Sequence, residues 1–201
     1  MKKGLIITLV VIGLIVLIAF VSIKGIYNNM VDKEQDVIAS WSQVENVYQR
    51  RMDLIPNLVE IVKGYAAHER ETLTAVIEAR SKMGGVTQLS PEALNDPQAL
   101  ERFSQAQASL GGTLQRLMML QENYPNLKAD QQFLKLQDQL EGTENRITNE
   151  RRRFIKSVQS FNTYIKRFPQ VILANNFGFS PKATFQATTG ADVAPSIDMS
   201  N

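Results

Sequence analysis

The 201-residue chain contains no cysteine and a single histidine, and both shortages limit its chemistry. Without cysteine it can form no disulfide, no thiolate zinc site and no thiol nucleophile. The histidine, His68, has Thr72 four residues after it and Tyr65 three residues before it. It therefore completes neither a paired-histidine zinc helix nor a Glu-x-x-His di-iron pair. We expect no metal site.

Signature motifs of catalysis and of phosphate binding are also missing. The sequence has no P-loop, no G-x-G-x-x-G and no G-x-S-x-G. The carboxylates that could act as acid or base, such as Glu69 and Glu144, lie among basic residues, where salt bridges explain them better. We therefore expect no catalytic residue and no cofactor. An enzyme that uses Glu69 or Glu144 is the least favoured hypothesis.

The chain also lacks an excess of charge outside its N-terminus. Of 22 Lys and Arg residues, Lys2 and Lys3 stand at the N-terminus, and the rest equal the 20 Asp and Glu residues in number. Nucleic-acid binding needs a basic footprint, which this balanced body does not have. We expect no nucleic-acid partner.

What the chain does have is an uncharged run of twenty residues from Gly4 to Ile23. A helix of this length rises roughly 30 Å, which matches the hydrocarbon core of a bilayer. The run is longer than the apolar part of a cleaved signal peptide, and no Ala-x-Ala site follows it. Residues 1–25 are therefore expected to be a transmembrane anchor, with a cleaved signal as the alternative.

The orientation of the anchor is weakly encoded. Lys2, Lys3 and the α-amino group lie on one side of the run, and Lys24 and Lys33 lie on the other. The positive-inside rule narrowly favours a cytoplasmic N-terminus with the body on the periplasmic or extracellular side. A flank of three residues is easily translocated, so the reverse orientation stays open.

After the anchor, apolar residues recur every three or four positions in three tracts, which predicts three amphipathic helices. The expected helices cover residues 27–82, 97–124 and 130–168, and they form an all-α, up-and-down antiparallel bundle over residues 26–174. Pro56 is expected to kink the first helix without dividing it. Gly111-Gly112 is expected at a close helix contact. The three apolar stripes are Val37, Trp41, Val44, Tyr48, Arg51, Ile55, Leu58, Val62, Tyr65, Leu73, Val76, Ile77 and Arg80; Leu100, Phe103, Gln107, Leu110, Leu114, Leu117, Gln121 and Tyr124; and Phe133, Leu136, Leu140, Thr143, Ile147, Glu150, Phe154, Val158, Phe161, Ile165 and Phe168.

The segment from 175 to 201 is rich in Gly, Ser, Thr, Pro and Ala, with isolated Phe177, Phe179 and Phe185. Its last fifteen or so residues have the composition of a disordered tail. The part with the three phenylalanines is a candidate to dock on the bundle.

Polar residues interrupt the first and third stripes about halfway along, which predicts a polar layer in the bundle. Such a layer fixes helix register more than it adds stability. Tandem arginines could instead bind an anionic headgroup or phosphate. The candidates for this layer, or for contact with a partner or headgroup, are Arg50, Arg51, Asp53, Asn57, His68, Glu69, Arg80, Glu144, Asn145, Glu150 and Arg151.

Several blocks of the sequence together resemble the LemA family of bacterial single-span membrane proteins. They are the N-terminal span, Tyr27 to Val31, Trp41, Arg50 to Val59 (RRMDLIPNLV), Val62 to Glu69, Ala79-Arg80, Glu122 to Ala129 (ENYPNLKA), Leu136-Gln137, Leu140-Glu141, Thr143 to Ile147 (TENRI), Phe161-Asn162, Phe168-Pro169 and Phe177 to Phe179. The chain departs from the family at Phe154-Ile155, where Tyr-Asn is frequent, and at Phe185-Gln186, where Phe-Glu is frequent. The resemblance implies a bundle of long antiparallel helices on a membrane anchor. It implies no reaction, because the biochemical function of the family is not settled.

The leading hypothesis is a non-enzymatic helical scaffold or adaptor of the bacterial cell envelope, anchored in the cytoplasmic membrane by one span. It would act by self-association or through contacts with other membrane or envelope proteins. The alternative is a protein that binds a lipid headgroup or small ligand in a basic crevice near Arg50, Arg51 and Arg151.

Overall fold

The computed structural model describes residues 2–84 and 89–185, and these residues form helices and connecting turns with no strand among them. The all-α prediction is confirmed. Four long helices dominate: α1 (Lys2–Tyr65), α2 (Arg70–Met83), α3 (Pro97–Met119) and α5 (Gln131–Lys166). The shorter elements are η1 (Pro91–Asn95), η2 (Leu120–Glu122), α4 (Pro125–Lys128) and α6 (Gln170–Phe177).

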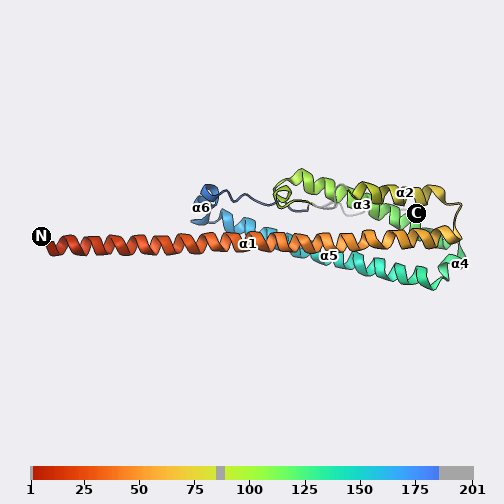
Figure 1. The fold of residues 1–201 in the computed structure, drawn as a ribbon, viewed down its shortest axis with the longest axis horizontal. Helices are drawn as coiled ribbons and strands as arrows, with labels where there is room; N and C mark the ends of the chain where they lie inside the picture. The colour runs from red at the N-terminus through yellow and green to blue at the C-terminus, as the bar shows by residue number, and fades with distance from the viewer. Residues whose placement is uncertain (1, 85–88, 186–201) are drawn as a thin grey trace, which may run out of the picture.

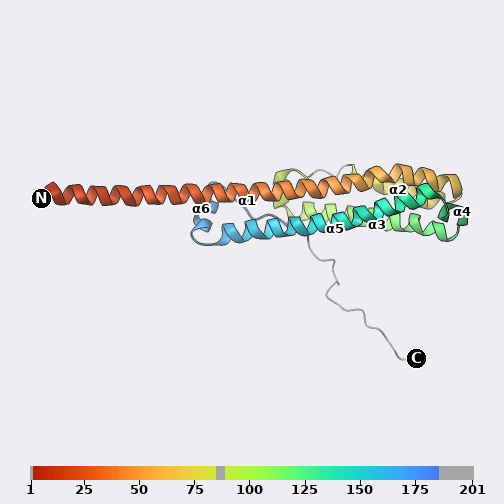
Figure 2. The same cartoon turned by 90° about the horizontal axis from the view of Figure 1, so that it is seen from below.

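The long helices run up and down in an elongated bundle (Figure 1). The second half of α1 packs along α5, and α2 packs along α3. The turn from α1 to α2 and the turn around α4 lie at one end, which we call the distal end (Figure 2). The N-terminal part of α1, residues 2–25, extends alone beyond the other end, which we call the membrane-proximal end (Figure 1).

The isolated part of α1 is the apolar run seen in the sequence. Its most apolar 18-residue window has a mean hydropathy of 3.2, and none of it is buried within the protein. In the described part of the chain, α1 is the one helix long and apolar enough to cross a membrane. Because α1 continues without interruption to Tyr65, the candidate span and the first helix of the body are one element.

The first predicted helix, 27–82, is wrong at its C-terminal part. The chain leaves α1 at Tyr65, turns through Ala66 to Glu69 and returns as α2. The reversal allows the apolar face of α2 to pack on the same apolar cluster as the end of α1. The bundle therefore has four long antiparallel segments instead of three.

Gly111 and Gly112 were also expected at a close helix contact, and the structure does not place one there. A Cβ added at Gly111 would meet only the Arg51 Nη1 atom, at 3.8 Å, and one added at Gly112 would meet nothing within 4 Å.

Two apolar clusters form the interior of the bundle. The distal cluster joins the end of α1 to α2, α3 and the start of α5, and its largest buried members include Ile55, Leu117 and Phe133. The proximal cluster contains Trp41, whose ring lies 5.2 Å from that of Phe103 and 5.1 Å from that of Phe154. Edge-to-face aromatic contacts of this kind add to the stabilisation from area burial.

Two of the long helices begin at a capping aspartate. Asp96 caps α3 by accepting a hydrogen bond from the Gln98 amide at 2.9 Å, with Pro97 at the first helical position. Asp130 caps α5 by accepting from the Phe133 amide at 2.8 Å. The helix that the sequence placed at 97–124 ends at Met119 and continues into η2, and the one placed at 130–168 spans Gln131–Lys166.

Candidate functional site

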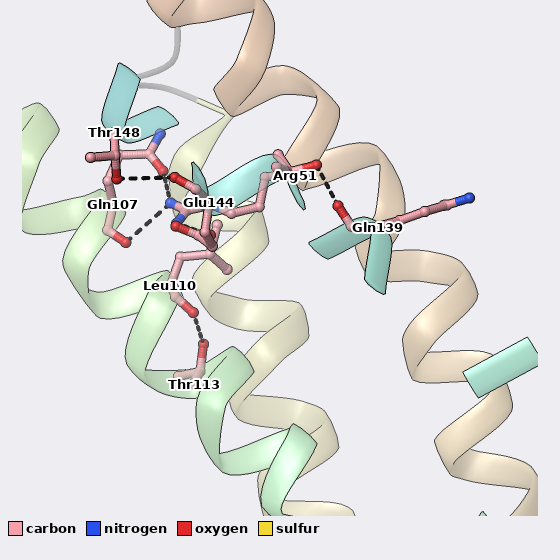
Figure 3. A network of polar contacts seen from close by, with 8 residues as sticks. Arg51, Gln107, Leu110, Thr113, Gln139, Glu144 and Thr148 are labelled. Carbon is pink, nitrogen blue, oxygen red and sulfur yellow. Dashed lines mark hydrogen bonds and ion pairs between the residues drawn. The ribbon is translucent and has the colours of Figure 1, made fainter. Parts of the chain in front are cut away.

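A buried polar layer lies between the two apolar clusters, where Arg51 of α1 reaches Gln107 of α3 and Glu144 of α5 (Figure 3). Arg51 is only 4% exposed, and its Nη1 atom lies 2.8 Å from a carboxylate oxygen of Glu144. Its Nη2 atom donates to the Gln107 side-chain oxygen and, at 3.2 Å, to the Gln107 carbonyl. The layer therefore ties three helices at one height, which fixes their register.

Tyr48, one turn before Arg51, extends the layer toward the proximal cluster. The Arg51 guanidinium lies 5.1 Å from the centre of the Tyr48 ring. Burial raises the pKa of the Tyr48 phenol, and the nearby charges of Arg151 and Arg51 partly offset that rise. The phenol is therefore neutral at physiological pH and serves as a packing group with a polar tip.

Arg80 of α2 donates from its Nε atom to the Met52 carbonyl of α1 at 3.3 Å. Met52 is four residues before Pro56, so this carbonyl would accept from residue 56 in an ordinary helix. Proline has no amide hydrogen to donate. Arg80 therefore supplies a donor for this carbonyl. As expected, Pro56 does not divide the helix, but the expected kink is wrong, because α1 continues across Pro56 without a sharp bend (Figure 1).

Two tyrosines join elements at the distal end. The Tyr65 hydroxyl donates to Asp130 at 2.8 Å, and the Tyr124 hydroxyl donates to Glu69 at 2.9 Å. The Phe133 amide, and secondly the Tyr65 hydroxyl, lower the pKa of Asp130, and the Asp130 carboxylate raises the pKa of Tyr65. Beside this contact lies a shallow hollow of about 590 Å³, lined by residues of α1 and α5 that include Asn57 and Tyr65.

Residues 178–185, which we call the C-terminal strap, run back along the bundle after α6. Lys182 is buried and forms an ion pair with Glu34 of α1 at 2.6 Å. The Asn162 side chain of α5 both donates to the Lys182 carbonyl and accepts from the Lys182 amide, each at 2.9 Å. The strap also contacts η1 through its backbone, since the Ala183 amide donates a hydrogen bond to the Leu94 carbonyl at 2.7 Å.

Aromatic side chains fix both ends of the strap. The Phe179 ring lies 5.8 Å from Tyr27, and the Phe185 ring lies 5.6 Å from Phe154. The phenylalanine-bearing segment therefore does dock on the bundle. The expected disorder of the last fifteen or so residues falls on residues 186–201, which lie outside the described part of the chain.

The remaining residues singled out from the sequence are dispersed along the bundle. Asp53 accepts from Gln49 at 2.8 Å, and Glu150 pairs with Arg153 at 2.9 Å. Both pairs lie within one helix and stabilise it locally. His68 lies exposed in the turn between α1 and α2, and Asn145 lies exposed on α5.

The three arginines of the expected basic crevice do not form one site: Arg51 and Arg151 both lie near Tyr48, whereas Arg50 lies apart from them. Arg51 is buried in the polar layer, and the Arg151 guanidinium lies 4.2 Å from the centre of the Phe185 ring. Arg50 is exposed and lines a separate hollow of about 260 Å³ together with Lys135 and Arg146. Any anion bound by Arg50 would meet a different set of basic residues from the one the sequence suggested.

Sequence reasoning missed several of the residues that connect the helices. Gln107 stood as a polar residue in an apolar stripe, which was a usable signal. Lys182 had no such signal, because an extended strap has no helical period. Glu34 lies outside the apolar stripe of its helix, and Asn162 stood out only as part of a block that resembles the LemA family. In residues 2–84 and 89–185, no group of three or more His, Asp or Glu side chains is placed to hold a metal ion.

A family model described as the LemA family matches residues 40–199. Magnetosome protein MamQ of Magnetospirillum gryphiswaldense is 28% identical over an alignment that covers 96% of this chain and 76% of that protein. Magnetosome protein MamQ 2 of Paramagnetospirillum magneticum is 26% identical, with coverage of 94% and 76%. Protein LemA of Metamycoplasma hominis is 24% identical, with coverage of 82% and 70%.

Proposed function

Because the chain belongs to the LemA family, as the resemblance in its sequence indicated, we propose that it is a membrane-anchored, non-enzymatic helical scaffold of the bacterial cell envelope. Two of the relatives reported above are called magnetosome proteins, and these names refer to the magnetosome and not to a reaction. This supports a structural role in this chain.

The observation that carries the proposal is the continuity of α1. One helix begins in the apolar span and ends at Tyr65 at the distal end, with α5 packed along its second half. From Lys24 to Tyr65 it rises roughly 60 Å at about 1.5 Å per residue. The bundle is therefore a stiff rod that holds its distal end far from the bilayer. A scaffold that binds other proteins at a distance from the membrane needs such a shape.

The distal half offers apolar side chains for partners. Outside the span, the large apolar residues exposed on the four long helices of the body are Tyr65, Ile77, Met119 and Leu134, besides Tyr27 near the membrane. Each of the first four lies on a different helix in the distal half. Single apolar residues on a surface are ordinary. The hollow beside Tyr65, with these four side chains in the same half of the bundle, supports contact there with a second copy or another envelope protein.

Self-association can be tested on full-length protein in mild detergent by analytical ultracentrifugation. We expect an oligomer that Met119→Glu plus Leu134→Glu dissociates. The matched control, Ser109→Glu plus Asn149→Glu, adds the same charge at exposed positions of α3 and α5 away from the distal end and should leave the oligomer intact. A strictly monomeric protein that also yields no crosslinked species in cells would refute the scaffold proposal.

The side of the membrane can be tested because the chain has no native cysteine. A Ser180→Cys variant, at an exposed position, would be treated with a membrane-impermeant maleimide in intact and in lysed cells. Labelling in intact cells agrees with a body outside the cytoplasm. Labelling only after lysis would place the body in the cytoplasm and redirect the search for partners.

The hollow beside Arg50 suggests a second candidate function, the binding of a small anion. Arg50 is 26 residues beyond Lys24, which is roughly 40 Å along the helix. Headgroups of the bilayer that holds the span cannot reach it, so a soluble anion fits better than a lipid. Calorimetry with inorganic phosphate would test this, since Arg50→Ala plus Arg146→Ala should abolish any heat of binding.

A further inference from the structure

Apolar side chains are exposed where the bundle meets the span. Phe168 is 80% exposed, and Ile172 and Phe177 of α6 are each 52% exposed. Ala174 of α6 is buried in the proximal cluster, and Ile172 lies on the far side of this short helix from it. The helix therefore packs on the bundle through Ala174 and leaves Ile172 and about half of the Phe177 side chain exposed.

The position of this face relative to the span is set by α1. The Phe177 ring lies 5.0 Å from the ring of Tyr27, so α6 sits beside α1 at the membrane-proximal end (Figure 1). Tyr27 is four residues past Ile23, which is roughly 6 Å along the helix. Each interfacial layer of a bilayer is about 5–8 Å thick. Tyr27 and its neighbours on α6 therefore lie at the depth of the headgroups.

The charged residues at the membrane-proximal end also fit a position among lipid headgroups. Lys24, Lys166 and Arg167 are exposed there. The first 31 residues contain no Asp or Glu, and neither does the stretch between Glu150 and Asp192. Aromatic residues with flanking Lys and Arg are typical of protein segments that lie in the interface of a bilayer, and basic residues there attract anionic headgroups.

We propose that Tyr27, Phe168, Ile172 and Phe177, which we call the membrane foot, insert into the interface of the bilayer that the span of α1 crosses. Lys24, Lys166 and Arg167 contact anionic headgroups around it. The foot gives the bundle a second attachment point beside α1. It sets the angle at which the rod leaves the membrane and limits rotation about the span.

The membrane foot can form only if the span of α1 is inserted in the bilayer, as the proposed function requires. The experiment therefore measures insertion of the span and insertion of the foot separately. Single cysteines at Leu14, Ile172 and Ile77 would carry a nitroxide spin label in the full-length protein. Each variant would be reconstituted at one copy per nanodisc of phosphatidylcholine and phosphatidylglycerol, so that no second copy can cover Ile77. Collision rates with oxygen, which enters lipid, and with a nickel chelate, which stays in water, report the depth of the label. Leu14 tests the span, and Ile77, equally exposed but on α2 in the distal half, is the matched control.

The foot predicts an oxygen-to-nickel ratio at Ile172 several-fold above that at Ile77 and below that at Leu14. A second label at Phe168→Cys should agree with Ile172. If Leu14 reports lipid but Ile172 matches Ile77, the foot is wrong while the anchor stands. A label at Ile172 shielded from both reagents would mean that a protein covers this face, which also overturns the inference. A water-exposed Leu14 would refute the anchor itself, and the foot with it.

Discussion

Arg80 of α2 donates a hydrogen bond to the Met52 carbonyl of α1, the carbonyl that Pro56 leaves without its helix donor. This contact satisfies the acceptor that Pro56 leaves unpaired within a helix of 64 residues. It also ties α2 to α1 at a point where the backbone has an unused acceptor.

The first prediction is that the effects of Arg80 and Pro56 are coupled. Arg80→Ala should lower the free energy of unfolding by about 1 kcal/mol, because it removes the donor to an otherwise unpaired carbonyl. In a Pro56→Ala background the helix supplies its own donor, and the same substitution should cost much less. Chemical denaturation of the four proteins gives the coupling energy, and equal costs in both backgrounds would contradict this role of Arg80.

The ion pair between Arg51 and Glu144 is the basis of the second prediction. Glu144→Ala leaves the guanidinium buried with one partner fewer, and should lower the free energy of unfolding by about 1–3 kcal/mol. The matched control is Glu141→Ala, an exposed change on the same helix, which should stay within about 0.5 kcal/mol of the parent. If the two variants unfold at similar denaturant concentrations, the ion pair does not stabilise the fold, and the role assigned to the polar layer is wrong.

The C-terminal strap should detach when Asn162 is truncated. Asn162→Ala removes both hydrogen bonds to the Lys182 backbone. Hydrogen exchange should speed up at residues 179–185, while α1 and α5 keep their protection. Thr163→Ala, one residue on and exposed, is the control and should leave the strap unchanged. Unaltered exchange in the strap after Asn162→Ala would contradict this role of Asn162 and show that the Lys182–Glu34 ion pair, the Ala183–Leu94 hydrogen bond and the aromatic contacts suffice to hold it.

The Phe133 amide, and secondly the Tyr65 hydroxyl, lower the pKa of Asp130, which predicts a pH dependence of stability. The pKa of Asp130 is lower in the folded protein than its usual value, so the carboxylate stabilises the fold above about pH 4 and loses this effect as the pH falls through the folded pKa. Asp130→Asn cannot titrate. The advantage in melting temperature of the parent over this variant should therefore shrink from neutral to acidic pH, and an advantage that is constant or grows in acid would contradict the assignment.

Much of the bundle could be predicted because apolar residues recur at helical spacing along its long helices. The stripes that include Trp41, Phe103 and Phe154 gave the helices, and their polar interruption at Arg51 coincides with the layer in the structure. The turn after Tyr65 was missed although the stripe weakens there. Position 69, where the period calls for an apolar side chain, is glutamate, and the next apolar residue in phase is Leu73.

Other features could not be read from the pattern. The pairing of Lys182 with Glu34 joins an irregular segment to a helix far away in the sequence, and only the folded chain brings them together. The donor from Arg80 to Met52 depends on the reversal of α2, which the prediction of one helix over 27–82 excluded. Both are contacts between elements, which local periodicity does not encode.

The central claim is that one unbroken helix carries the bundle from the bilayer to its distal end. Spin labels at Ser22→Cys and Lys63→Cys, both at exposed positions of α1, would measure this by pulsed electron resonance in nanodiscs. A continuous helix places the two backbone positions roughly 60 Å apart at about 1.5 Å per residue, with a narrow distribution. A broad distribution or one centred well below that distance would mean that α1 bends or breaks between the membrane and the bundle, and would contradict the rod on which the scaffold proposal depends.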